Sequence, residues 1–161
     1  MTLQELNAAN PETLRKALAD CCGSESWVDR MITQRPFDDA SQLQTAANDM
    51  WWSLSQSDWL EAFSKHPKIG ERKPSGKWSA EEQRGMDQAA SGTARCMADL
   101  NRAYQEKFGW IFIICATGKS AEEMRNQLEQ RLGNDPAAEI RIAAHEQAKI
   151  TRLRLQKLLD T

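Results

Sequence analysis

Apolar residues recur along most of this chain at the spacing of one face of a helix. The clearest case is the C-terminal region, where they fall broadly on one side of a helix running from about Pro136 to the end of the chain. Segments 41–54 and 89–107 show the same period. The apolar positions of the C-terminal helix are Ile140, Ala143, Ala144, Ile150, Leu153 and Leu158. The pattern predicts a largely helical protein.

Helix start signals occur at four places. Asn10 and Asp135 each precede a proline, which suits the cap and the first turn of a helix. Ser79 and Ser120 are each followed three residues later by a glutamate, an arrangement that typically forms a capping box. We therefore expect a helix to begin at each of these four places.

Two segments do not follow the helical period. Residues 66–77 contain two prolines, two glycines and several basic residues, which indicates an exposed, ordered loop. Residues 111–115 form a β-favouring apolar run between Gly109 and Gly118. Since one extended segment cannot form a sheet by itself, we expect an all-α fold of about eight or nine helices with one buried extended segment near 110–117.

The length, composition and charge of the chain indicate a globular protein of one domain. At 161 residues the chain is long enough for one ordinary domain, so we expect a single domain over 1–161. Charged residues make up 27% and hydrophobic residues 40%, as in globular proteins. With a net charge of -2 and mixed signs along the chain, we expect no nucleic-acid partner.

Neither a membrane span nor a metal site is expected from the sequence. The N-terminus lacks a basic start and an apolar run, and no stretch approaches the length of a transmembrane helix, which favours a cytoplasmic protein. The four cysteines form no Cys-x-x-Cys pair, and two histidines are too few to complete a zinc pattern. We expect reduced thiols and no metal.

Gly118-Lys119-Ser120 superficially matches the end of a phosphate-binding loop. Such a loop needs a further glycine five residues earlier, and Ile113 occupies that position. No βαβ pattern surrounds the segment either. A strand-like segment that turns at Gly118 into a helix capped by Ser120 is the better interpretation.

A few polar residues could carry chemistry, although each has an ordinary structural explanation. His66 precedes a proline, which favours an extended backbone in a loop and suits proton exchange near neutral pH, yet such a histidine is more often a surface residue. Glu82 could simply close a capping box with Ser79, and Gln83 could face solvent. Arg154 could favour the dipole of the last helix. Residue chemistry leaves these alternatives open.

Four groups of residues, taken together and in order, resemble the 2-oxo-4-hydroxy-4-carboxy-5-ureidoimidazoline (OHCU) decarboxylase family. The resemblance covers nearly the whole chain. Gly85 and Met86 depart mildly from the alanine-like residues expected there. The four groups are His66-Pro67-Lys68-Ile69-Gly70, Ser79-x-x-Glu82-Gln83, Leu100-Asn101-x-x-Tyr104-x-x-Lys107-Phe108-Gly109-x-x-Phe112-Ile113-Ile114-Cys115-Ala116, and Glu146-x-x-Lys149-Ile150-x-x-Leu153-Arg154.

The resemblance implies roles for particular residues. His66 would be the catalytic proton donor, Glu82 its acidic partner, and Arg154 would face the negative charge of the substrate. Pro67 would line the ring site. The remaining substrate-binding residues would be Ser79 and Gln83, through hydrogen bonds, and Phe112, Ile113, Ile114, Cys115 and Ala116, through main-chain N–H and C=O groups.

The resemblance also implies an activity: decarboxylation of OHCU to (S)-allantoin during urate degradation, without a cofactor, by a homodimer. The substrate carries its own electron sink, a C=N bond adjacent to the carboxylated carbon. The competing hypothesis is a non-catalytic helical interaction module that uses the six tryptophans as contact residues. Tryptophans on apolar helical faces are, however, more often core or subunit interface.

Overall fold

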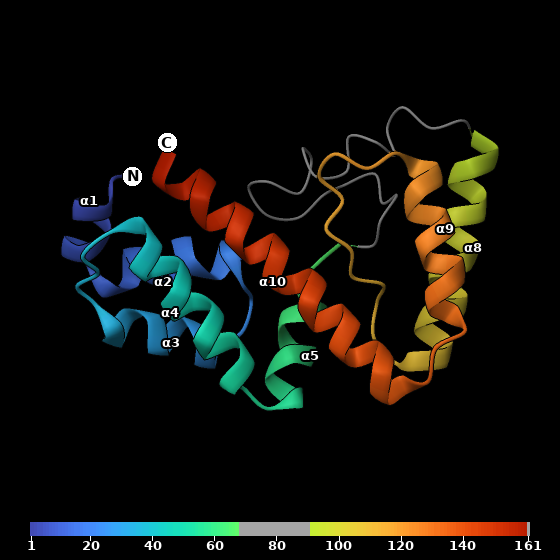
Figure 1. Cartoon of the computed structure of the whole chain (residues 1–161), viewed down its shortest axis with the longest axis horizontal. Coiled ribbons are helices and arrows are strands. Elements are labelled where there is room, and N and C mark those ends of the chain that lie inside the picture. Colours follow the sequence, from blue (N-terminus) through green and yellow to red (C-terminus); the bar gives the residue numbers. More distant parts are fainter. Residues whose placement is uncertain (68–90, 161) are drawn as a thin grey trace. The chain divides into compact units, whose positions relative to one another are not determined.

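The computed structural model describes residues 1–67 and 91–160 and contains only helices as regular secondary structure in those ranges (Figure 1). This confirms the prediction of an all-α fold. No helix in the described ranges is long and apolar enough to cross a membrane. The helices are α1 (Leu3–Ala8), α2 (Pro11–Cys21), α3 (Glu25–Gln34), α4 (Ala40–Ser53), α5 (Gln56–Ser64), α8 (Ser91–Phe108), α9 (Ala121–Leu132) and α10 (Pro136–Asp160).

Three of the four predicted helix starts are confirmed. The Asn10 side chain accepts from the N–H of Glu12, and Pro11 is the first residue of α2. The Ser120 hydroxyl accepts from the N–H of Glu123 at the start of α9, and α10 begins at Pro136. The predicted start at Ser79 lies outside the described residues. A reciprocal capping box, not foreseen from the sequence, begins α1 at Thr2 and Glu5.

The described residues divide into two compact units, each with its own core. Unit 1 comprises Met1–Ala62 and the end of the chain from Ala148. In it, α3 packs against both α2 and α4. The indole N–H of Trp27 donates to the carbonyl of Ala47, and that of Trp59 donates to the carbonyl of Trp51. These three tryptophans are buried core residues of unit 1.

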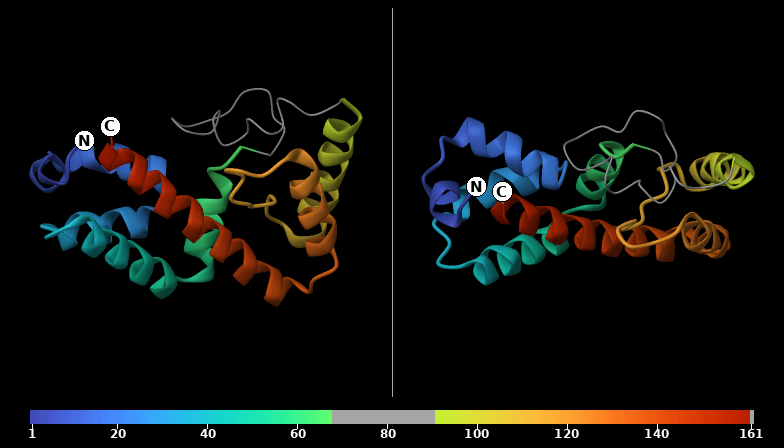
Figure 2. Two further views of the ribbon diagram at one scale, coloured as in Figure 1. Left: turned by 45° about the horizontal axis from the view of Figure 1, so that its top comes forward. Right: turned by 90° about the horizontal axis from the view of Figure 1, so that it is seen from above.

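Unit 2 comprises residues 63–147 and is built around α8 and α9, which lie side by side (Figure 2). The two helices run in the same direction, because the ammonium of Lys107 at the end of α8 donates to the carbonyls of Leu132 and Asn134 at the end of α9. The chain between them must therefore run back along the pair. The core cluster joins all three parts and contains Met97, Tyr104, Phe108, Phe112, Ile114, Ala116, Ala121, Met124 and Leu128.

The returning chain is the non-helical segment expected near 110–117. Residues 111–116 belong to no helix, and residues 112–116 are buried. Gly109 and Gly118 flank the segment with φ angles of 88° and 79°. Residues with a side chain rarely adopt such backbone angles, so glycine is favoured at both turns. The prediction of one buried extended segment is confirmed, as is the turn at Gly118 into a helix capped by Ser120.

Candidate active site

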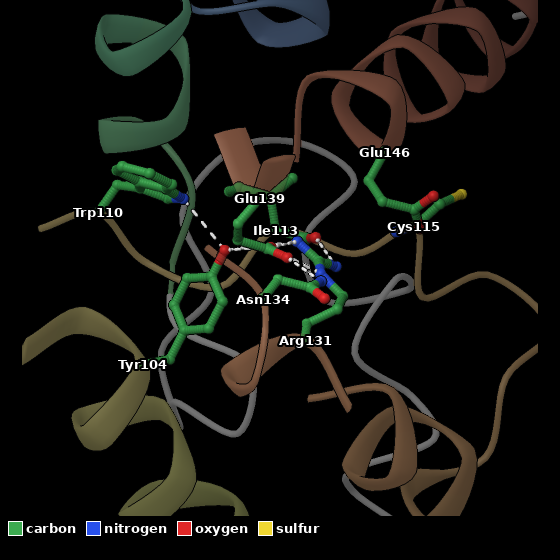
Figure 3. A network of polar contacts seen from close by, with 8 residues as sticks. All are labelled: Tyr104, Trp110, Ile113, Cys115, Arg131, Asn134, Glu139 and Glu146. Carbon is green, nitrogen blue, oxygen red and sulfur yellow. Dashed lines mark hydrogen bonds and ion pairs between the residues drawn. The ribbon is translucent and has the colours of Figure 1, made fainter. Parts of the chain in front are cut away.

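A buried ion pair at the centre of unit 2 holds the extended segment in place (Figure 3). Nη2 and Nε of Arg131, on α9, lie 2.6 and 2.8 Å from Oε2 of Glu139, on α10. Nη1 of the same guanidinium donates to the carbonyl of Ile113 over 2.7 Å. Arg131 also stacks on Phe112, with 4.4 Å between the guanidinium carbon and the ring centroid. One side chain thus fixes two consecutive residues of the segment.

Tyr104 and Asn134 complete the environment of the Glu139 carboxylate. The Tyr104 hydroxyl donates to Oε2 over 2.5 Å and accepts from the Trp110 indole over 3.1 Å. The Asn134 amide donates to Oε1 over 3.1 Å. Burial, followed by the hydrogen bond to Glu139, raises the pKa of Tyr104 above its ordinary value, so the phenol remains a hydrogen-bond donor. The desolvation cost of burying the carboxylate is therefore offset by several donors.

Cys115 is held on both sides of its main chain. Its N–H donates to Oε1 of Glu146, on α10, over 3.1 Å. Its carbonyl accepts from the ammonium of Lys119 over 2.8 Å. The carbonyl of Ala116 accepts from the main-chain N–H of Lys119. Lys119, which belongs to the Gly118-Lys119-Ser120 sequence, therefore closes the turn at the end of segment 111–116 and has a structural role.

The main chain of Ile114 contrasts with that of Cys115, whose N–H and carbonyl are both held. Among the described residues, no hydrogen-bond partner is found for the N–H or the carbonyl of Ile114, and of the Ile113 main chain only the carbonyl has one. The residue is 4% exposed. A buried peptide group without a partner costs free energy unless another molecule supplies one. Ile114 thus presents one donor and one acceptor that a polar ligand could use.

His66 also belongs to unit 2, immediately after α5. Its main-chain N–H donates to the carbonyl of Phe63, and its ring is half-buried. Nε2 of the ring lies 2.5 Å from Oε1 of Gln147, a residue with 0% exposure. Gln147 directly follows Glu146 on α10, so consecutive residues of one helical turn hold His66 and Cys115.

The remaining predicted site residues are distributed as follows. Pro67, half-buried, is adjacent to His66. Arg154 lies in unit 1, where its Nη1 donates to the carbonyl of Asp20 over 3.0 Å. Ser79, Glu82 and Gln83 lie outside the described residues. No group of three or more potential metal ligands is found among residues 1–67 and 91–160.

Sequence reasoning missed Gln147 and the Arg131–Glu139 pair. A signal for Gln147 was present, because it lies at helical spacing from Ala143, Ala144 and Ile150 and is thus a polar residue on an apolar face. Arg131 and Glu139 offered no such signal, since they lie on different helices and a single sequence does not pair them.

The sequence matches the OHCU decarboxylase family over residues 7–156. The chain belongs to this family. The uric acid degradation bifunctional protein TTL of Arabidopsis thaliana is 42% identical over an alignment of 148 positions that covers 87% of this chain and 45% of that protein. The chain thus spans less than half of that bifunctional relative. An OHCU decarboxylase of Halalkalicoccus jeotgali is 30% identical over an alignment of 161 positions that covers 98% of this chain and 92% of that protein.

Two solved structures have the same fold. The crystal structure of an OHCU decarboxylase in the presence of (S)-allantoin superimposes with a TM-score of 0.82 at 36% identity, covering 95% of this chain and all of that one. A crystal structure of (S)-allantoin synthase, at 19% identity and a TM-score of 0.77, covers 100% of this chain and 55% of that one. The second likeness concerns the fold only.

Proposed function

We propose that this protein decarboxylates OHCU to (S)-allantoin, as the names of its relatives indicate for those proteins. The observation that carries the proposal is the shared anchoring on α10. Glu146 holds Cys115 and Gln147 holds His66, so a proton-exchanging ring and a segment with main-chain donors and acceptors are tied to the same helical turn. A flat polar heterocycle can pair its edges with the main-chain groups, and the ring of His66 can exchange a proton with it.

The substrate-binding role belongs, in this proposal, to the main chain of residues 112–116. The N–H and carbonyl of Ile114 are suited to pair with the ureido or imidazoline edge, because neither has a protein partner in the described part of the chain, whereas the main-chain groups of Cys115 and the carbonyl of Ile113 do. Pro67 would line the ring site beside His66. Ser79 and Gln83 would add hydrogen bonds, and Arg154 would face the substrate's negative charge.

The reaction breaks the bond between the carboxylate and the carbon that also carries the hydroxyl group. The released electron pair forms a C=C bond to the neighbouring carbon, while the electrons of the C=N bond move to the nitrogen, which takes up a proton; this gives an enol-like intermediate and CO2 without a cofactor. His66 then delivers a proton to one face of the neighbouring carbon, with Glu82 as its acidic partner, as the hydroxyl group loses its proton and becomes the carbonyl. Delivery from one face yields one enantiomer. General acid catalysis of this kind contributes about 100- to 10,000-fold, and positioning supplies the rest.

Stereochemistry is the appropriate readout, because OHCU also decays without protein to racemic allantoin. Freshly generated OHCU is mixed with the wild-type protein, and the circular dichroism of the allantoin is compared with a sample without protein. We expect a large excess of the S enantiomer only with the protein. A racemic product in both samples would exclude the decarboxylase activity and favour the interaction module.

The burial of three of the six tryptophans argues against that interaction module. Trp27, Trp51 and Trp59 are at most 5% exposed and pack inside unit 1, so these three are core residues and not surface contacts. We further propose that the protein acts in the cytoplasm as a homodimer. Both proposals are supported by the resemblance of the sequence to the family.

A further inference from the structure

The contact between His66 and Gln147 has a chemical consequence for the proton donor. Gln147 is a fully buried amide on α10, and burying an amide costs free energy unless its polar atoms are paired. Its carbonyl oxygen Oε1 lies 2.5 Å from Nε2 of His66. A polar residue at this place is explained if it serves the imidazole ring.

An amide oxygen carries no hydrogen and can only accept a hydrogen bond. Nε2 of His66 must then carry a hydrogen in both the neutral and the protonated ring. The neutral ring therefore has its lone pair on Nδ1, and the protonated ring can lose its proton from Nδ1 without breaking the bond to Gln147.

We propose that Gln147 is a positioning residue that holds the His66 ring with hydrogen on Nε2, so that His66 exchanges its proton through Nδ1. The use of this proton on the substrate rests on the proposed function. The tautomer does not, because it exists in the protein without substrate.

Glu146 positions the extended segment in the same way. Its carboxylate accepts from the N–H of Cys115 over 3.1 Å, one residue along α10 from the group that holds His66. The ring and the segment are therefore positioned by one rigid turn of helix.

Nitrogen-15 NMR of labelled histidine tests the tautomer directly. The chain has two histidines, His66 and His145, and His145 is exposed. The substitution His145→Gln therefore leaves His66 as the only source of an imidazole signal. At a pH where the ring is neutral, we expect an Nε2–H tautomer with an unprotonated Nδ1. Gln147→Leu should convert it into a mixture of tautomers, while Gln147→Glu, which keeps an acceptor, should retain Nε2–H.

Kinetics supply the second readout. Gln147→Leu should lower kcat by about 10-fold, the equivalent of one hydrogen bond, with KM nearly unchanged and a smaller excess of one enantiomer. Gln147→Glu should recover most of that loss. Thr151→Val is the matched control, because it removes another buried polar group from α10 that contacts Cys21 in unit 1. It should change neither the tautomer nor kcat.

An Nδ1–H tautomer in the wild-type protein would overturn this proposal, as would an unchanged tautomer in Gln147→Leu. A wild-type protein with the Nε2–H tautomer that yields racemic allantoin would instead overturn the proposed function. The two failures are therefore distinguishable.

Discussion

Arg131 and Glu139 combine two roles that are usually separate: they form a buried ion pair, and the arginine also holds the carbonyl of Ile113. The side chains are 7% and 0% exposed. A buried pair is weak support for stability as such, because desolvation opposes the Coulombic gain, but removal of one partner leaves an uncompensated charge. The pair therefore ties the stability of unit 2 to the position of its extended segment.

Arg131→Met should lower the free energy of unfolding by about 3–5 kcal/mol, because the Glu139 carboxylate would lose its cationic partner. Urea denaturation followed by far-UV circular dichroism measures the change. Arg131→Met combined with Glu139→Gln is the control and should lose less than the single variant. A single variant as stable as the wild type would contradict the assigned role.

The thiol of Cys22, in unit 1, should make the free energy of unfolding depend on pH. Burial is the main cause that raises the pKa of its thiol to about 12 from an ordinary value of 9.0, while hydrogen bonds to Ser24 and Thr151 and the charge of Arg154 lower it. Between these two values the unfolded chain has lost the thiol proton and the folded chain keeps it. Stability from this group is thus complete below pH 9.0 and falls as the pH rises toward 12.

Urea denaturation at about pH 8 and about pH 10.5 tests this dependence. The wild-type protein should lose more stability between the two conditions than Cys22→Ala, because the alanine variant lacks the titrating thiol. The comparison is of differences, so the cavity left by the substitution cancels. Equal losses in both proteins would show that the Cys22 thiol titrates as it does in the unfolded chain.

Single residues were predictable from the sequence to very different degrees. His66 could be proposed from its motif, and its role as proton donor stays a prediction. Its contact with Gln147 spans 81 positions along the chain, and such pairings depend on how helices pack. Only the polar residue on an apolar helix face hinted at a special role.

The extended segment 111–116 is the element that distinguishes this fold from a plain helical bundle. Its apolar, β-favouring residues and its flanking glycines indicated it in advance, as the caps at Asn10 and Ser120 indicated α2 and α9. The parallel course of α8 and α9 could not be foreseen. Helix periodicity gives which face is buried but not the direction in which the next helix runs.

Gly118→Ala tests the turn at the end of this segment. The glycine has φ 79°, and a methyl group added there would meet open space, so the cost is the left-handed backbone itself, about 1–2 kcal/mol. Gly92→Ala is the matched control, since Gly92 lies in α8 and also has open space around it. Alanine there should stabilise the helix by up to about 1 kcal/mol. Thermal unfolding measures both, and a stabilised Gly118→Ala would contradict the turn.

In the molecule as a whole, two helices belong to both compact units. The division falls within α5, between Ala62 and Phe63, and within α10, between Gln147 and Ala148. A helix interrupted at its middle loses main-chain hydrogen bonds on both sides of the break. We therefore predict that the chain unfolds as one cooperative domain.

Urea unfolding followed by two signals tests this cooperativity. Tryptophan fluorescence reports strongly on unit 1, which contains Trp27, Trp51, Trp52 and Trp59, and far-UV circular dichroism reports on the helices of both units. Coincident transitions are expected for a single two-state domain. Transitions with different midpoints would show that the two units unfold independently.

In the proposed reaction, His66 delivers the proton that sets the configuration of allantoin. This role is best tested by the circular dichroism of allantoin formed from fresh OHCU by the wild-type protein, His66→Ala and His145→Ala, the last serving as the control because His145 is exposed. We expect an excess of (S)-allantoin with the wild type and the His145 variant. We expect a racemic product with His66→Ala, at a rate lower by about 100- to 10,000-fold. An unchanged rate and enantiomeric excess in His66→Ala would contradict this role of His66.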